Sequence, residues 1–263
     1  MTVKIMDLNL KNKTVLVTGS TLGIGNRIVE TFLQEGARIL INGRDEEKIT
    51  REKNRLIRQF GEDRVFAFTG DMTELGKIKT CQKYVHDIWG HLDILVPCLG
   101  TGKAVSDERL DLMEWEHMMR CNLYASIDLI REFTPLLEKG DEANIVLISS
   151  VVAYERANAP YAYAAAKRAV LALCGYMAED YAHKKIRVNC VVPGNVFFEG
   201  GRWEELQKAD PEGTKRYVKE NVPMCRFGRP EEIADAVVFL ASARSSFTTG
   251  AALVVDGGQK RSI

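Results

Sequence analysis

A tyrosine and a lysine lie four residues apart in YAYAAAK, the segment from Tyr161 to Lys167. On a helix, Tyr163 and Lys167 would share one face, which places a phenol beside an ammonium group. A free tyrosine has a pKa near ~10 and is a poor proton-transfer group at neutral pH, whereas a nearby cation stabilises its phenolate. Taken alone, such a pair is more typical of an ordinary helix than of a catalytic site, so its context decides.

Three glycines follow a short apolar run in TVLVTGSTLGIG, which extends from Thr14 to Gly25. Gly19, Gly23 and Gly25 stand where a strand would turn into a helix, although their spacing differs from the G-x-G-x-x-G dinucleotide fingerprint. Glycine at such a turn lets a pyrophosphate approach backbone N–H groups and lets the helix contact the strand. The glycines alone leave two interpretations open, a dinucleotide-phosphate site and an ordinary strand-to-helix turn.

These groups need a scaffold, and short β-branched runs alternate with helical patterns along the chain. Near-continuous apolar strands separated by helices are typical of a parallel sheet covered on both faces. We therefore expect a Rossmann-type, doubly wound α/β fold with about seven strands. The expected strands are TVLVTG, ARILIN, RVFAFTG, DILV, ANIVLISS, IRVNCVV and ALVVDGG.

No internal repeat or linker divides residues 1–263, so the sequence predicts a single domain. The longest irregular region runs from Pro193 to about Arg229, and a long excursion late in a compact domain is more often functional than a linker. We expect a substrate lid at about residues 195–226.

The composition excludes several classes of protein. Lys plus Arg and Asp plus Glu both number 36, so no net field favours nucleic acid or an anionic membrane. The six cysteines form no C-x-x-C pair and have no metal-ligand spacing with the four histidines, so we expect no metal site and reduced thiols in a cytoplasmic protein. No apolar run approaches the ~18 residues of a membrane helix.

Ser150 ends the strand in ISS, thirteen residues before Tyr163. At this point the chain resembles the short-chain dehydrogenase/reductase family, whose signature combines TGxxxGIG, a serine after the fifth strand and YxxxK. The resemblance spans Thr14 to Gly258. It also includes Asn122 in RCNLYAS, Pro193-Gly194 after the sixth strand, FGRPEEIA from Phe227 to Ala234, and VVDGG.

The resemblance implies four catalytic roles. Tyr163 would protonate the carbonyl oxygen during reduction and act as base in the reverse direction, while Lys167 would lower its pKa and bind the nicotinamide ribose. Ser150 would hold the substrate oxygen, and Asn122 would position a water that relays protons to Lys167. These four roles are chemically sufficient, because the cofactor carries the hydride and the protein need only orient the carbonyl and supply a proton.

The resemblance also implies the cofactor-binding residues and favours NADP(H). Gly43 stands where NAD-preferring relatives have Asp, and Arg44 follows it; arginine favours a ribose 2′-phosphate. NAD(H) stays open because Leu22 occupies the place of a second basic residue. The expected cofactor contacts are Gly19, Ser20, Thr21, Gly23, Ile24, Gly25, Arg44, Asp71, Met72, Cys98, Gly100, Tyr163, Lys167, Pro193, Gly194 and Val196.

The chain departs from the family after the fourth strand, where relatives usually read N-N-A-G. Here Pro97, Cys98 and Leu99 precede the retained Gly100. Because proline lacks an N–H, the strand should end at about Val96. We expect altered hydrogen bonds around Cys98 with cofactor binding intact, and a small, semi-buried thiol rather than a nucleophile.

A second departure concerns the lid. Phe198 stands where relatives have a threonine that binds the cofactor, which leaves the carboxamide to the backbone at about Val196. Rings facing the crevice would indicate a substrate with a large apolar part, whereas a helix over Trp203–Ala209 could instead bury Trp203 against the sheet. The other apolar lid residues are Phe197, Tyr217 and Met224. Of the nearby tyrosines, Tyr161 should pack at its helix start, and Tyr154 should cap its loop or line the pocket.

These observations predict an oxidoreductase that interconverts a carbonyl and a secondary alcohol. A 3-oxoacyl thioester reductase is the leading substrate assignment, with polyol, sugar and hydroxysteroid dehydrogenases as alternatives. A sensor that binds the nucleotide without catalysis is a different class, which the intact set of four catalytic residues argues against. By analogy with the family we expect a homotetramer or homodimer acting on a small molecule.

Overall fold

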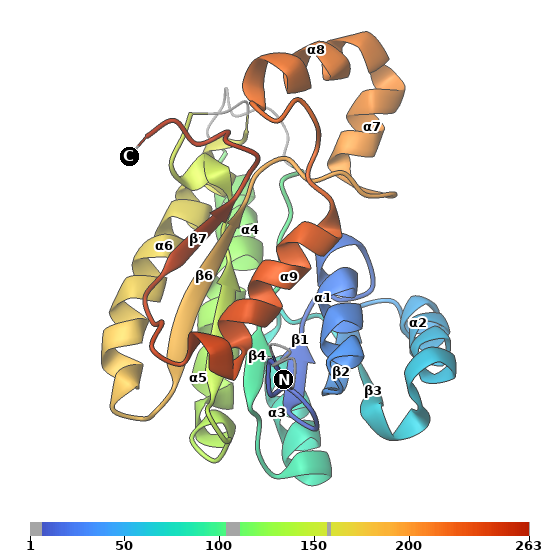
Figure 1. Ribbon diagram of the computed structural model, residues 1–263, viewed down its shortest axis with the longest axis vertical. Coiled ribbons are helices and arrows are strands. Elements are labelled where there is room, and N and C mark those ends of the chain that lie inside the picture. Colours follow the sequence, from blue (N-terminus) through green and yellow to red (C-terminus); the bar gives the residue numbers. More distant parts are fainter. Residues whose placement is uncertain (1–6, 104–110, 157–158, 263) are drawn as a thin grey trace, which may run out of the picture.

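Seven parallel strands form one sheet in the computed structural model, which describes residues 7–103, 111–156 and 159–262 (Figure 1). The strand order is β3-β2-β1-β4-β5-β6-β7, which confirms the Rossmann-type expectation and all seven predicted strands. The strands are β1 (Thr14–Val17), β2 (Arg38–Gly43), β3 (Val65–Thr69), β4 (Ile94–Val96), β5 (Asn144–Ile148), β6 (Arg187–Pro193) and β7 (Ala252–Val255).

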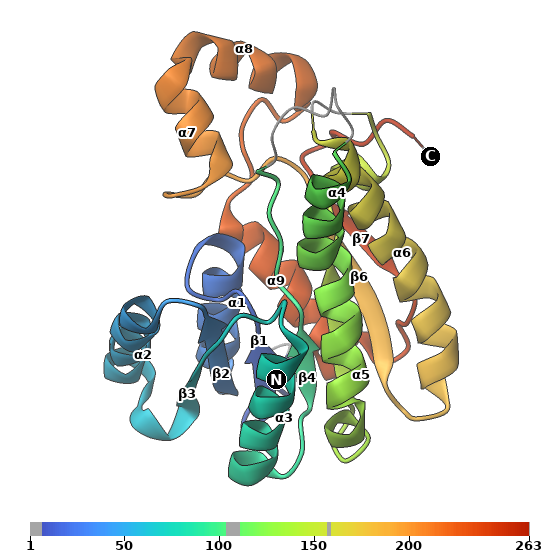
Figure 2. The same cartoon turned by 180° about the vertical axis from the view of Figure 1, so that it is seen from behind.

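Helices cover both faces of the sheet. Figure 1 shows α1 and α9 in front of it with α2 beside them, and Figure 2 shows α3, α4, α5 and α6 on the opposite face. The helices are α1 (Gly23–Gln34), α2 (Glu46–Phe60), α3 (Leu75–Trp89), α4 (Leu112–Met119), α5 (Ala125–Leu137), α6 (Tyr161–Ala182), α7 (Arg202–Ala209), α8 (Pro211–Asn221) and α9 (Pro230–Ala241).

The central positions of the strands are mostly apolar because each face of the sheet has its own core. Successive side chains of a strand point to opposite faces. Val15 and Val17 of β1 join the core under α1 and α9, whereas Leu16 between them joins the core under α3, α5 and α6. All three side chains are fully buried, so burial on both faces explains the lack of polar alternation.

The strand order reverses between β1 and β4. From β1 the chain moves outward to β2 and β3, and then returns to add β4 on the other side of β1. In open α/β sheets, ligands bind in the crevice that this reversal leaves at the carboxyl ends of the strands. The glycine-rich turn follows β1, and Pro97 follows β4, so both border this crevice.

The excursion between β6 and α9 contains two helices, whereas the sequence predicted one helix and otherwise irregular chain. Helix α7 begins one residue before the predicted Trp203, and α8 was missed. Asp210 caps α8 by accepting a hydrogen bond from the Gly213 N–H at 2.8 Å, and Pro211 opens the helix. In Figure 1 both helices stand beyond the carboxyl edge of the sheet.

Trp203 does not pack against the sheet. Its ring contacts those of Tyr217 and Phe227, with centroid separations of 5.0 Å in both cases. None of the helices in the described ranges is long and apolar enough to cross a membrane.

Candidate active site

A cavity of about 680 Å³ lies at the carboxyl edge of the sheet. It runs from Arg44 and Asp71 at one end to Ser150 and Tyr163 at the other. The fold brings nearly all the predicted site residues to this cavity. Its lining includes Gly19, Thr21, Ile24, Gly25, Arg44, Asp71, Met72, Cys98, Gly100, Asn122, Ser150, Tyr163, Lys167, Pro193, Gly194 and Val196.

Two of the predicted cofactor contacts, Ser20 and Gly23, are not part of this lining. Ser20 is fully buried behind the turn, where its hydroxyl accepts a hydrogen bond from the Asn42 N–H at 2.9 Å. The Phe198 ring covers Gly23 so closely that a Cβ atom at position 23 would lie 2.7 Å from it. Ser20 therefore supports the turn from behind, and Gly23 makes room for the Phe198 ring; their contact with a cofactor stays a prediction.

The glycine-rich turn is as tight as its backbone permits. Gly19 has a φ of +61°, and a Cβ atom there would lie 2.8 Å from the carbonyl oxygen of Cys98. A Cβ atom at Gly25 would lie 2.5 Å from the carbonyl oxygen of Gly19. Among the described residues no side chain caps α1, so its first N–H groups stay available to an anion. The turn therefore fits a dinucleotide pyrophosphate.

The end of the cavity that holds Ser150 and Tyr163 is built from the tip of β5 and from α6. The Lys167 Nζ donates to the carbonyl oxygen of Ile148 at 3.0 Å, and the Ser149 hydroxyl donates to the carbonyl oxygen of Lys167 at 2.8 Å. These two bonds tie helix to strand. The Lys167 Nζ lies 5.7 Å from the centroid of the Tyr163 ring, and the Tyr163 hydroxyl hydrogen-bonds Ser150. The fold thus gathers the predicted serine, tyrosine and lysine.

Burial dominates the ionisation of this group. It raises the pKa of Tyr163, and the hydrogen bond with Ser150 only partly opposes it. It lowers the pKa of Lys167, which is 4 % exposed. The expected lowering of the tyrosine pKa by Lys167 is not seen in the protein chain, where burial and the Ser150 hydrogen bond are the two influences. Tyr163 keeps its proton at neutral pH, as a proton donor requires.

Asn122 lies in a π-helical turn, Arg120–Tyr124, that interrupts the passage from α4 to α5. Its Nδ2 donates to the carbonyl oxygens of Met118 at 3.0 Å and Thr101 at 3.1 Å, and its Oδ1 accepts from the Thr101 N–H at 3.1 Å. A Cβ atom at Gly100 would lie 2.6 Å from that Oδ1. The asparagine thus holds the loop after β4, and its approach requires the retained glycine.

Pro97 ends the pairing of β4 at Val96, as predicted. The following Cys98 N–H donates to the Thr18 hydroxyl at 3.2 Å, which anchors the turn that lacks the usual asparagines. Burial raises the pKa of the Cys98 thiol to about 11, although the Lys167 charge counteracts it. The thiol is a half-buried packing group, in line with the sequence prediction.

The adenosine end is more open. Arg44 is 78 % exposed along its side chain and pairs with Asp71 at 3.6 Å. Burial works against the charged form of Asp71, but hydrogen bonds from Thr73 and the charge of Arg44 outweigh it and lower its pKa. Met72, the residue after Asp71, is buried and lines the cavity. A guanidinium at this end fits the 2′-phosphate of NADP(H).

Phe198 and Trp203 line the cavity, so for these two residues the crevice-facing alternative is the one observed. Phe197 instead packs on Phe227, with ring centroids 5.7 Å apart. Met224 is exposed.

The two nearby tyrosines lie apart from the cavity lining. Tyr161 is 57 % exposed at the start of α6. The Tyr154 ring lies 4.3 Å from the Lys260 ammonium and 5.9 Å from the Arg168 guanidinium.

Sequence reasoning missed several lining residues. Asn42 could have been predicted from the sequence, because it is a polar residue at the end of an otherwise apolar strand. Lys103 could not have been predicted from the sequence, since its position depends on an ion pair with Glu205 of α7. The missed residues include Asn42, Gly70, Thr73, Thr101, Lys103, His117, Cys121 and Ser149.

Residues 19–260 match the family model described as enoyl-(acyl carrier protein) reductase. The chain belongs to the short-chain dehydrogenase/reductase family of oxidoreductases. It is 34% identical to the uncharacterized oxidoreductase YvaG of Bacillus subtilis, over 98% of this chain and 100% of that protein. It is 30% identical to the 3-oxoacyl-[acyl-carrier-protein] reductase FabG of Thermotoga maritima, over 95% and 99%.

The fold is also similar to a solved structure of L-sorbose reductase from Gluconobacter frateurii, complexed with NADPH and L-sorbose. The TM-score is 0.91 at 28% identity, and the match covers 98% of this chain and 100% of that one.

Proposed function

We propose that this protein is an NADPH-dependent reductase that converts a carbonyl to a secondary alcohol, with Tyr163 as the proton donor. One observation carries the proposal. A single cavity holds a protonated, Ser150-bonded tyrosine at one end and Arg44 at the other, with the glycine-rich turn between them. The NADPH in the related sorbose reductase supports the cofactor assignment, and NAD(H) is the alternative that the assay must exclude.

The cofactor would supply the hydride when bound, and the protein's residues would do the rest. The Ser150 hydroxyl would orient the carbonyl oxygen, and Tyr163 would donate its proton to that oxygen. Lys167, fixed to the tip of β5, would stabilise the phenolate that this transfer leaves. Asn122 would hold the loop beside Lys167 and position a water that returns the proton.

We propose that residues 195–226, with α7 and α8, act as the substrate lid of a single domain. Phe198 and Trp203 bring apolar rings to the cavity, which supports a substrate with a substantial apolar part. A 3-oxoacyl thioester has such a part, and the similarity to the Thermotoga reductase points the same way. A sugar or polyol is the second candidate, because the structural similarity to sorbose reductase extends over nearly the whole chain.

Self-association into a dimer or tetramer is part of the proposal. Tyr124 at the end of the π-helical turn and Tyr176 on α6 are 43 % and 73 % exposed, which supports a face that a second copy would cover. Light scattering of the purified protein tests this, and a monomer at assay concentration would contradict it.

The deciding experiment is a substrate panel run with both NADPH and NADH. It contains a 3-oxoacyl thioester, a ketose, a polyol with the oxidised cofactors and a ketosteroid. We expect turnover of the thioester with NADPH to exceed that of the others. Faster turnover of the ketose would favour the sugar reductase, and NADPH binding without any turnover would favour a nucleotide sensor.

A further inference from the structure

Two asparagine side chains hold the glycine-rich turn from different elements. Asn42, at the end of β2, accepts from the Gly19 N–H through its Oδ1 at 3.4 Å, and its Nδ2 donates to the carbonyl oxygen of Gly70 at 3.0 Å. Its backbone exchanges hydrogen bonds with Ser20. This side of the turn is therefore joined to the tips of β2 and β3.

Asn26 of α1 holds the other side. Its Nδ2 donates to the carbonyl oxygen of Ser20 at 3.3 Å and also to a carboxylate oxygen of Glu52 on α2. A peptide unit is planar and trans, so its carbonyl oxygen and the next N–H point in opposite directions. Fixing the Ser20 oxygen toward Asn26 therefore turns the Thr21 N–H away from Asn26, at a residue that lines the cavity.

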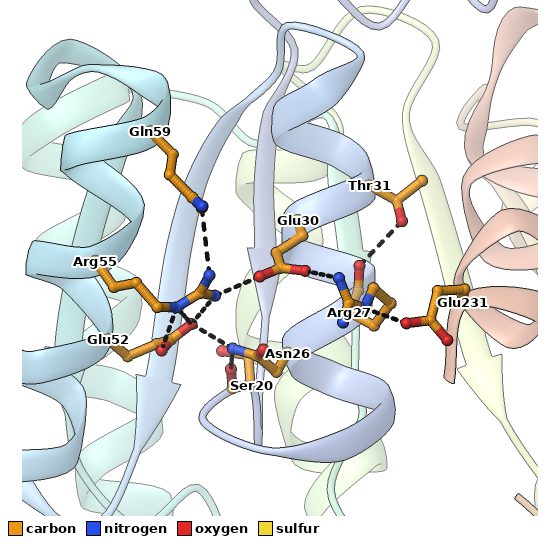
Figure 3. Close-up of polar contacts among 9 residues, drawn as sticks. All are labelled: Ser20, Asn26, Arg27, Glu30, Thr31, Glu52, Arg55, Gln59 and Glu231. Carbon is orange, nitrogen blue, oxygen red and sulfur yellow. Dashed lines mark hydrogen bonds and ion pairs between the residues drawn. The ribbon is translucent and has the colours of Figure 1, made fainter. Parts of the chain in front are cut away.

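A charged network stands behind Asn26 (Figure 3). Arg55 donates to Glu52 from its Nε at 3.0 Å and also pairs with Glu30, a carboxylate that is only 9 % exposed. Arg27 pairs with the same Glu30 and, at 2.9 Å, with Glu231 of α9. Arg55 thus holds both Glu52 oxygens, one from its Nε and the other from its Nη2, and the second of these oxygens also accepts from Asn26.

The charge state of Glu52 suits this role. Burial disfavours its charged form, but hydrogen bonds from Arg55 and Asn26 outweigh that effect and lower its pKa. The carboxylate is therefore an acceptor at neutral pH, and hydrogen bonds to charged groups are stronger than neutral ones.

We propose that Asn26 is a positioning residue for the dinucleotide. It holds the Ser20 carbonyl and thereby aims the Thr21 N–H at the phosphate, while Glu52 and Arg55 of α2 hold Asn26. The inference rests on the proposed cofactor site. It adds α2 to the elements that set cofactor affinity, although α2 itself contributes no residue to the cavity lining described above.

The test compares Asn26→Ala and Glu52→Ala with a matched control, Gln59→Ala. Gln59 accepts a hydrogen bond from Arg55 at 3.2 Å in the same network, but within the described residues the Asn26 side chain bonds Ser20 and Glu52 and not Gln59. We expect Asn26→Ala and Glu52→Ala each to weaken NADPH binding about tenfold, as loss of a charge-assisted hydrogen bond implies. The double variant should bind NADPH no more weakly than the single variant with the lower affinity. Both substitutions break the same hydrogen-bonded link between Glu52, Asn26 and Ser20.

Binding is measured by NADPH fluorescence, KM and kcat by turnover, and stability by thermal unfolding. A merely structural role would lower the unfolding temperature while leaving the Kd and KM for NADPH unchanged, and that result would overturn the proposal. So would an equal loss in Gln59→Ala. If Asn26→Ala does not fold, the size-matched Glu52→Gln takes its place and should weaken binding twofold or more. Wild-type protein that fails to bind NADPH would instead refute the cofactor site itself.

Discussion

The two ends of the cavity hold their cationic side chains in different ways. Lys167 is 4 % exposed and bonded to a backbone carbonyl on a neighbouring strand, so both its position and its surroundings are rigid. Arg44 is 78 % exposed, and its charged partner, Asp71, lies 3.6 Å away at the next strand tip. One cation is part of the core, and the other is part of the surface.

This difference has a physical consequence. Charges act strongly where water is excluded, and weakly where solvent and salt screen them. The buried end can therefore shift the ionisation of Tyr163 and decide whether the reaction occurs. The exposed end can decide only which cofactor binds and how tightly. Substitutions at the two ends should differ in size and in kind.

The largest effect should follow from Tyr163→Phe at the buried end. Loss of the proton donor is expected to lower kcat for carbonyl reduction about 10³-fold, within the range of general acid catalysis. NADPH affinity should stay within about threefold, because the hydroxyl makes one hydrogen bond at most to the cofactor. Steady-state turnover and NADPH fluorescence measure the two quantities. A Tyr163→Phe variant with full reductase activity would refute the mechanism.

A smaller and selective effect is expected from Arg44→Ala at the exposed end. Removing a charged donor to the 2′-phosphate should raise the KM for NADPH about ten- to hundredfold. The KM for NADH should change less than about twofold, since NADH lacks that phosphate. Parallel kinetics with both cofactors test this. An equal rise in KM for NADPH and NADH would show that Arg44 supports the glycine-rich turn and does not bind the 2′-phosphate.

Phe198→Ala tests the lid, which lies between the Arg44 and Tyr163 ends of the cavity. The ring packs on Gly23 and Gly201, and its removal opens the cavity wall. We expect the KM for an apolar substrate to rise about tenfold, the equivalent of ~1.4 kcal/mol of lost apolar contact. Leu206→Ala on α7, a half-buried lid position outside the cavity lining, is the control. An unchanged KM would place the substrate away from Phe198.

The smallest effect is expected from Cys98→Ala. Among the described residues no hydrogen bond joins the thiol to a catalytic side chain, and only the charge of Lys167 acts on it, so kcat and KM should change less than about twofold. Because burial raises its pKa to about 11, alkylation by iodoacetamide at pH 8 should be slow and should accelerate as the pH rises toward that value. Exposed Cys225 is the internal reference in a mass-spectrometric time course. Rapid labelling of Cys98 at pH 8 would contradict the packing role.

Local patterns predicted the strands well because burial on both faces leaves an unusual signal, a run of apolar, β-branched residues. The sequence analysis did not predict α8. This helix has a weak apolar face because of its position in the lid, and only the Asp210-Pro211 pair indicates where it begins. The sequence did not show that the Ser20 side chain is buried behind the turn, because spacing along a turn does not tell which side faces the cavity. Trp203 was ambiguous for a similar reason, because a ring can pack on any apolar neighbour.

The sequence by itself determined the order of the strands' apolar runs, the glycine-rich turn and the i, i+4 pairing of Tyr163 with Lys167, all of which depend on short-range geometry. Only the tertiary structure decided the balance of charges. Burial raises the pKa of Tyr163, a threonine hydroxyl supports Cys98 where relatives usually have asparagines, and α2 reaches the glycine-rich turn through Asn26. Desolvation and contacts between distant segments exist only once the chain has folded, so no local pattern encodes them.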